Sequence, residues 1–177
     1  MLFIIFINVL LAFDNDEHHL NLNADSDCRI SEIFTTNLIT NTRICLVQCQ
    51  FKNIGSKTSQ QSALYIGNSN EPNIINIIES CIFQNCSSQN GGAVFIYGQS
   101  QSFTNITNCV FSSNECSNHG GAIYISRSNV NFSRCHFTKN RASLQAQTNI
   151  NKCYGGSILF EFSSGFLINC TFINNEI

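Results

Sequence analysis

The chain has 177 residues, of which 11% are charged, and its formal net charge is −2. A nucleic-acid-binding domain of this size would carry a basic stripe, so this balance argues against a nucleic-acid partner and equally against an acidic solvating tail. The length is that of one domain, large enough to bury a core.

Residues 1–13 are apolar and are followed by a polar, acidic leader at 14–29. The apolar stretch is short for a transmembrane span and is typical of the apolar core of a secretory signal, although the usual basic residue is missing. We expect a cleaved signal, with an uncleaved anchor or a buried first strand as alternatives; a helix fits either of the first two. The mature protein is then secreted or held at the cell surface, and it meets a membrane only through this segment if cleavage fails.

Ten cysteines in so short a chain fit an oxidising compartment. Asn-x-Ser/Thr sequons agree with that compartment and predict N-glycosylation. The sequons lie at Asn85, Asn105, Asn131 and Asn169. Two of them have Cys in the middle position, which makes them poorer acceptors.

A motif of Cys-x-Phe, usually leading into Asn, recurs along the chain and is followed by Gly-Gly-Ala or Gly-Gly-Ser and a short apolar strand. Its cysteines are Cys49, Cys81, Cys109, Cys135 and Cys170, and the Gly pairs begin at Gly91, Gly120 and Gly155. Successive cysteines lie 32, 28, 26 and 35 residues apart, as expected for fixed strands joined by variable loops. The motif predicts an all-β fold, a right-handed parallel β-helix of about four coils over residues 30–177. An antiparallel sandwich is the alternative, but it gives no reason for the motif to recur.

Each coil is expected to hold three short strands, which in the cleanest copy are 122–125, 129–132 and 135–137. Stacking in register would place like residues above like, at about 4.8 Å per coil. The predicted inner columns are the five motif cysteines and the phenylalanines Phe51, Phe83, Phe111, Phe137 and Phe172. A third column is expected to stack its amides as a ladder at the corner, from Asn53, Asn85, Asn114, Asn140 and Asn175. The Gly pairs are expected where φ is positive or the next coil is too close for a side chain.

These residues carry a family resemblance. The Gly-Gly-Ala-Val/Ile segments at Gly91 to Val94 and Gly120 to Ile123, together with Phe-x-x-Asn at Phe34 to Asn37, Phe111 to Asn114, Phe137 to Asn140 and Phe172 to Asn175, resemble the paired repeat of chlamydial polymorphic membrane proteins. Large surface-protein families of trichomonad-like protists look similar. The resemblance implies a right-handed parallel β-helix and a role in adhesion or surface display. The bacterial relatives also end in a membrane β-barrel, which this sequence lacks.

The remaining cysteines are candidates for disulfide bonds. Cys86, Cys116 and Cys153 each lie between a motif Asn and a Gly pair, so a bond from Cys116 to either of the others would join adjacent corners. Cys28 and Cys45 are further candidates, and the sequence leaves the pairing open. The motif cysteines are expected to be buried free thiols.

Catalytic chemistry finds little support in the sequence. Parallel β-helices also carry polysaccharide lyases and glycoside hydrolases, so such an enzyme is the alternative function. Those sites need clustered carboxylates, whereas beyond the leader this chain offers scattered glutamates and no Asp. Its histidines, His18, His19, His119 and His136, lack zinc-site spacing. We therefore expect no catalytic, cofactor-binding or metal-binding residues and no cofactor.

One segment interrupts the motif: residues 141–153 form a polar insertion between Phe137 and the next Gly pair. Long insertions at solenoid corners are where recognition usually occurs, although an unstructured excursion is equally compatible. The sequence predicts a non-catalytic, adhesin-like or display protein whose partner is a host or neighbouring cell-surface protein or glycan. A structural fragment of a larger surface protein is a further alternative, and the open last coil suggests end-to-end association.

Overall fold

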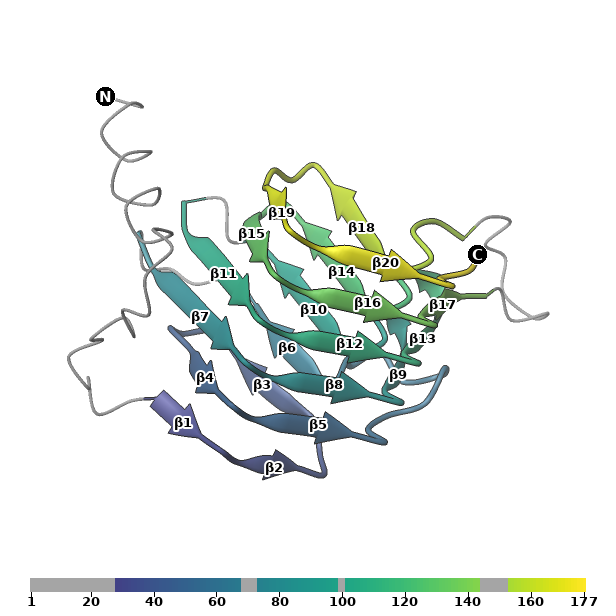
Figure 1. The fold of residues 1–177 in the computed structure, drawn as a ribbon, viewed down its shortest axis with the longest axis horizontal. Coiled ribbons are helices and arrows are strands. Elements are labelled where there is room, and N and C mark those ends of the chain that lie inside the picture. Colours follow the sequence, from purple (N-terminus) through teal and green to yellow (C-terminus); the bar gives the residue numbers. More distant parts are fainter. Residues whose placement is uncertain (1–27, 68–72, 99–100, 144–152) are drawn as a thin grey trace.

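We analysed a computed structural model of the chain, which describes residues 28–67, 73–98, 101–143 and 153–177. The described residues form an all-β solenoid built from four parallel sheets (Figure 1). We number the sheets 1 to 4 in the order in which the chain passes through them within a complete coil. After sheet 4 the chain enters the next coil. Residues 1–13, the predicted signal or anchor, lie outside the described part. Within that part, no helix has the length and apolar character needed to cross a membrane.

The strands of each sheet are as follows. Sheet 1 contains β1 (Cys28–Ile30), β4 (Cys45–Val47), β7 (Ile75–Glu79), β11 (Phe103–Thr107), β15 (Asn129–Ser133) and β19 (Leu167–Ile168). Sheet 2 contains β2 (Ile33–Phe34), β5 (Gln50–Lys52), β8 (Ile82–Gln84), β12 (Val110–Ser112), β16 (His136–Thr138) and β20 (Thr171–Ile173). Sheet 3 contains β9 (Ser87–Asn90), β13 (Glu115–His119) and β17 (Arg141–Ala142). Sheet 4 contains β3 (Leu38–Thr40), β6 (Leu64–Ile66), β10 (Val94–Tyr97), β14 (Ile123–Ser126) and β18 (Ile158–Glu161).

The prediction of a parallel β-helix of about four coils is confirmed. Four coils run from β4 to β18, with a short coil at either end, and the pairing in each sheet is parallel. The first strand begins at Cys28, two residues before the expected boundary at residue 30. Cys28 and Cys45 are register partners in sheet 1, and a disulfide bond joins them.

A ladder of phenylalanine rings runs through the core behind sheet 2. The rings are those of Phe34, Phe51, Phe83, Phe111, Phe137 and Phe172. Successive centroids lie 4.3 to 4.9 Å apart and successive planes differ by 4° to 8°. The spacing follows from in-register parallel pairing, which places each motif Phe directly above the preceding one. The sequence predicted this column, and the structure adds Phe34 at its first coil.

The motif cysteines form a second inner column at the corner between sheets 1 and 2. Cys49, Cys81, Cys109 and Cys135 are fully buried free thiols, and Cys170 is half-buried. Each of the four interior thiols donates to a carbonyl oxygen of the preceding coil, as Cys135 does to Ile106 at 3.3 Å. Burial, together with hydrogen bonds to Cys135 and Cys81, raises the pKa of Cys109 well above its ordinary value. The same hydrogen bonds to Cys109 lower the pKa of Cys81 and of Cys135, but full burial keeps all four interior thiols from contact with a substrate, so they serve as packing groups.

The motif asparagines occupy two columns rather than the single predicted one. Register pairs Asn53 with Asn85, and both adopt positive φ at the corner between sheets 2 and 3. Asn114, Asn140 and Asn175 lie one position further along the chain, because Ser113, Lys139 and Asn174 occupy the corner position with positive φ in their copies. The prediction of one column is thus wrong. The corner position needs a residue in the left-handed backbone conformation, and the amide ladder lies at the next position along the chain.

The inner amide ladder is fully hydrogen-bonded. Asn140 Nδ2 donates to Asn175 Oδ1 at 3.0 Å and to the Phe111 carbonyl at 3.0 Å. Its Oδ1 accepts from both the backbone N–H and Nδ2 of Asn114, at 3.1 and 3.0 Å. The ladder replaces sheet pairing at a corner where the backbone turns away, so it keeps buried polar groups satisfied.

Sheet 3 is a departure from the prediction, which had three strands per coil. Its strands are polar, as in Ser87–Asn90 and Glu115–His119, and lack the apolar alternation that marks a strand. Stacking of the coils forms the sheet nonetheless, since Glu115 pairs with Ser87 on one side and Arg141 on the other.

The Gly pairs turn the chain from sheet 3 into sheet 4. Gly120 has a φ of 69°, a backbone conformation that side chains disfavour. A Cβ on Gly121 would lie 2.0 Å from the Gly156 carbonyl oxygen of the next coil. The first Gly therefore provides the conformation and the second permits the close approach of neighbouring coils.

The disulfide candidates Cys86, Cys116 and Cys153 are free thiols in the structure. Register explains this difference from the prediction, since Cys116 pairs with Ser88, two residues beyond Cys86. The two thiols are therefore not at equivalent positions. Cys86 instead lies in the amide-ladder column, where its Sγ is 3.5 Å from the Phe51 carbonyl that an amide would otherwise bond.

The Cys28–Cys45 bond should stabilise the first coil. It closes a loop with a sequence separation of 17, and a loop of that length contributes about 3 kcal/mol. We expect the double variant Cys28→Ser/Cys45→Ser to melt at a lower temperature than the parent. Dithiothreitol should lower the parent's melting temperature to the same value and leave the variant unchanged. Equal melting of parent and variant without reductant would contradict the assignment.

Candidate functional site

The outer face of sheet 4 and the adjoining end of sheet 3 together gather all four tyrosines of the chain. Tyr65, Phe95 and Tyr124 occupy the middle, outward position of β6, β10 and β14 and are register partners. Tyr97 ends β10, and Tyr154 lies beside His119 through a bridge at the end of β13. We call these six residues, with His119 included, the tyrosine strip.

The rings of the tyrosine strip are in continuous contact. Phe95 stacks on Tyr124 with centroids 4.9 Å apart, and it meets Tyr65 edge-on at 5.3 Å. Tyr97 meets Phe95 at 6.2 Å, and Tyr154 stacks on His119 at 5.4 Å. Such contacts hold the rings in place without a bound partner. Tyr97 and Tyr154 remain 36% and 49% exposed, so two rings of a fixed array face solvent.

A carboxylate lies against the strip. The Tyr124 hydroxyl and the Ser126 hydroxyl both donate to Glu161 Oε2, the latter at 3.1 Å. Burial and then the hydrogen bond to Glu161 raise the pKa of Tyr124 to about 12. Burial lowers the pKa of His119, which favours its neutral form. At neutral pH both shifts favour the neutral forms of Tyr124 and His119 beside the Glu161 carboxyl group.

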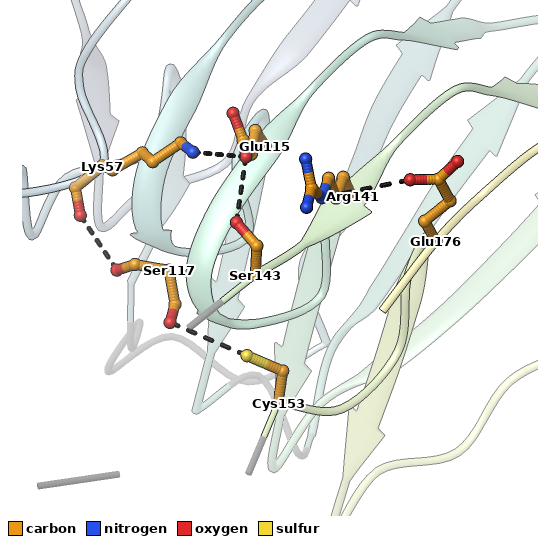
Figure 2. Close-up of polar contacts among 7 residues, drawn as sticks. All are labelled: Lys57, Glu115, Ser117, Arg141, Ser143, Cys153 and Glu176. Carbon is orange, nitrogen blue, oxygen red and sulfur yellow. Dashed lines mark hydrogen bonds and ion pairs between the residues drawn. The ribbon is translucent and has the colours of Figure 1, made fainter. Parts of the chain in front are cut away.

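The insertion predicted as a recognition element ends beside this strip. Residues 144–152 lie outside the described part, but the flanking residues are fixed to β13 (Figure 2). The Ser143 hydroxyl donates to Glu115 Oε1 at 2.9 Å, and Cys153 Sγ is 3.8 Å from the Ser117 carbonyl oxygen. Tyr154 follows directly, so the insertion ends at the tyrosine strip.

Charged pairs support the base of the insertion. Lys57 Nζ pairs with Glu115 Oε1, and the Ser117 hydroxyl donates to the Lys57 carbonyl at 2.9 Å (Figure 2). Arg141 lies 4.0 Å from Glu176 across adjacent coils. Because these ion pairs and the hydrogen bond link different coils, the cluster supports the backbone at the base of the insertion.

The predicted glycosylation sites lie on the outside of the solenoid in two settings. Asn85 and Asn169 are exposed corner residues with positive φ. Asn105 and Asn131 are register partners on the outer face of sheet 1, where Asn131 Nδ2 donates to Asn105 Oδ1 at 3.4 Å. Glycosylation at these sites stays a prediction.

The remaining candidates for chemistry are dispersed. His136 is exposed on β16 and contacts Thr171 at 2.6 Å, while His18 and His19 lie outside the described residues. No group of three or more metal-ligating side chains occurs within the described part of the chain. Glu32, Glu115 and Glu176 each pair with a basic side chain on a different part of the solenoid.

Fold and surface together define a β-solenoid with a fixed aromatic face. Residues 108–126 match the model of the Chlamydia polymorphic membrane protein repeat. The matched segment spans β12, β13 and β14, one full copy of the motif with its Gly pair. The resemblance seen in the sequence is thereby confirmed: the chain has the parallel β-helix of the polymorphic membrane protein type. The matched repeat suggests a surface-associated protein. Searches of curated proteins and of solved structures found no match to this chain.

Sequence reasoning missed the tyrosine strip, although the signal was present. The strands after the Gly pairs read Leu64-Tyr65-Ile66, Val94-Phe95-Ile96 and Ile123-Tyr124-Ile125, with an aromatic residue in the outward position each time. The predicted columns were those of the repeated Cys, Phe and Asn residues, and this outer aromatic column was not among them. Alternation alone places these rings on one face once the coils are stacked.

Proposed function

We propose that this chain is a secreted or cell-surface β-helix protein that acts by non-catalytic, adhesin-like binding, and that the tyrosine strip is its contact surface. The observation that carries this proposal is the collection of every tyrosine of the chain in one aromatic cluster, on the outer face of sheet 4 and the adjoining end of sheet 3. The matched membrane-protein repeat supports the surface location. The partner is a protein or glycan of a host or neighbouring cell.

Tyrosine is among the residues that most often dominate binding energy at protein interfaces. Its ring supplies contact area with few rotatable bonds, and its hydroxyl supplies a hydrogen bond. In the strip the rings are already ordered by mutual contact, so binding orders fewer side chains. Tyr97 and Tyr154 are the anchors, because they are the most exposed of the strip's tyrosines.

The placement of the carboxylates supports the non-catalytic part of the proposal. Glycoside hydrolysis needs two carboxyl groups about 5 to 9.5 Å apart across a bound sugar. Glu161 lies on sheet 4 and Glu115 on sheet 3, where it pairs with Lys57. Glu32 lies in the first coil and pairs with Arg29. A positive reducing-sugar or unsaturated-product assay on acidic polysaccharides would favour the enzyme alternative.

Cell binding tests the proposal. The labelled chain is incubated with cultured animal cells and with cells that produce it, and bound protein is measured by flow cytometry over a concentration series. Truncating an interface anchor typically costs 2 kcal/mol or more, so Tyr97→Ala and Tyr154→Ala should each weaken binding about tenfold or more.

Phe103 is the matched control for this experiment. It is 40% exposed, close to the 36% of Tyr97, but lies on the outer face of sheet 1. Phe103→Ala should leave cell binding unchanged. If all three variants bind as the parent does, or if Phe103→Ala is as damaging as Tyr97→Ala, the tyrosine strip is not the contact surface.

A further inference from the structure

Glu161 has no basic partner among the described residues, unlike three other glutamates of the solenoid. Glu32 pairs with Arg29, Glu115 with Lys57 and Glu176 with Arg141. Glu161 takes part in none of the ion pairs among the described residues, and its carboxylate accepts hydrogen bonds only at Oε2, from Tyr124 and Ser126. Glu79 also lacks an ion pair, but it lies on sheet 1 between Val47 and Thr107, away from the strip. Glu161 is thus the one such carboxylate set in an aromatic cluster.

The surroundings of Glu161 are electron-rich. Tyr97, Ser126 and Glu161 are register partners in adjacent coils, so Tyr97 and Glu161 lie two coils apart, roughly 10 Å, on the same outer column. The faces of aromatic rings attract cations, with estimates of about 0.5 to 2 kcal/mol. An exposed ring and an exposed carboxylate on one column together present a site with a need for positive charge.

We infer that the tyrosine strip binds an arginine side chain carried by the partner protein, with the guanidinium paired to Glu161 and lying against Tyr97. This inference rests on the proposed function. Arginine fits better than lysine because its planar fork can bond a carboxylate through two N–H groups while stacking on a ring. Glycan is less well suited, since Phe95 and Tyr124 already cover each other's faces and leave no extended row of open rings.

Peptides with a neutral isostere provide the test. The probes are Ac-Gly-Arg-Gly-Arg-Gly-NH2, the same peptide with citrulline at both arginines, and the same peptide with lysine. Each is titrated into the isotopically labelled full chain at low salt, and backbone amide shifts are followed by NMR. The arginine peptide should shift the amides of Tyr97, Ser126 and Glu161, the lysine peptide should bind more weakly, and the citrulline peptide should not bind.

Variants of the full chain localise the effect. Glu161→Gln keeps the shape and the hydrogen bonds from Tyr124 and Ser126 but removes the charge, so it should weaken arginine-peptide binding about fivefold or more. Glu79→Gln, the matched carboxylate control, should leave it unchanged. The inference is overturned if citrulline binds as well as arginine, if Glu79→Gln and Glu161→Gln behave alike, or if a panel of neutral and sialylated oligosaccharides shifts the strip while the peptides do not.

The two proposals fail in different ways. Cell binding that is lost in Tyr97→Ala but unchanged in Glu161→Gln overturns the arginine inference and leaves the tyrosine strip as the contact surface. Cell binding unchanged in Tyr97→Ala and Tyr154→Ala overturns the proposed function whatever the peptides do.

Discussion

Replacing Phe111 with alanine should lower the free energy of unfolding by about 3 to 5 kcal/mol, the usual range for a buried Phe→Ala change. Phe111 is fully buried, and its ring is stacked between those of Phe83 and Phe137 at 4.9 and 4.8 Å. Truncation therefore leaves a void with a ring on each side. Because the coils above and below are fixed by sheet pairing, they cannot close that void.

The measurement is urea unfolding followed by far-UV circular dichroism, with Phe172→Ala as the control. Phe172 belongs to the same ladder, but it is 48% exposed and stacks on Phe137 alone. Its truncation should be less than half as destabilising as that of Phe111. Equal effects of the two substitutions would mean that burial within the ladder is not what makes the rings stabilising.

Replacing Asn140 with alanine should be destabilising by about 3 to 5 kcal/mol. The change removes the acceptor for the Asn114 backbone N–H and Nδ2 and the donor to the Phe111 carbonyl, all of them buried. A buried polar group left without a partner is destabilising by about 1 to 3 kcal/mol, and more than one is created here.

Asn131→Ala is the matched control for the amide ladder. Asn131 also bonds an asparagine of the neighbouring coil, Asn105, at 3.4 Å, but it does so on the outer face of sheet 1 where water can replace the amide. Its loss should change the unfolding free energy by no more than about 0.5 kcal/mol. Were Asn131→Ala as harmful as Asn140→Ala, the buried ladder would have no special role.

The sequence was sufficient to predict those parts of the fold that repeat with fixed spacing. Cys109 and Phe111 recur with the same spacing in every copy of the motif, a Gly pair such as that at Gly120 follows in three of the copies, and stacking gives each of them a physical reason. Buried columns are therefore legible from sequence, because each coil must supply the same shape at the same height. The strands of sheet 3 were not, since their polar side chains are held by pairing with neighbouring coils.

Details of register escaped prediction for a related reason. Asn85 and Asn114 differ by one residue in their distance from the preceding motif Phe, so they belong to different columns. Only the structure shows which of the two positions turns the corner. The Cys28–Cys45 bond was equally hidden, because it depends on how the first two coils align. Cys86 and Cys116 lie in similar local sequences, yet register places them two positions apart in neighbouring coils.

The binding function predicted from the sequence stays a proposal, and the place of the candidate site was not predicted. The sequence suggested a binding protein and directed attention to the insertion at 141–153. The tyrosine strip arises instead from residues such as Tyr65 and Tyr154, far apart along the chain, that stacking brings into one cluster on sheet 4 and the end of sheet 3. No local window contains the strip, so it becomes visible only when the coils are aligned.

The inner amide ladder also has a direction. In Asn114 and Asn140 the amide oxygen faces the preceding coil, where Asn114 Oδ1 accepts the Cys86 N–H, while Nδ2 reaches the amide of the following coil. The amide dipoles are therefore parallel, and each hydrogen bond polarises the next. The inner amide ladder consequently has an electrical polarity along the solenoid axis. A coil turned end for end could not continue the ladder, even if its apolar side chains were identical to those of the coil it replaced.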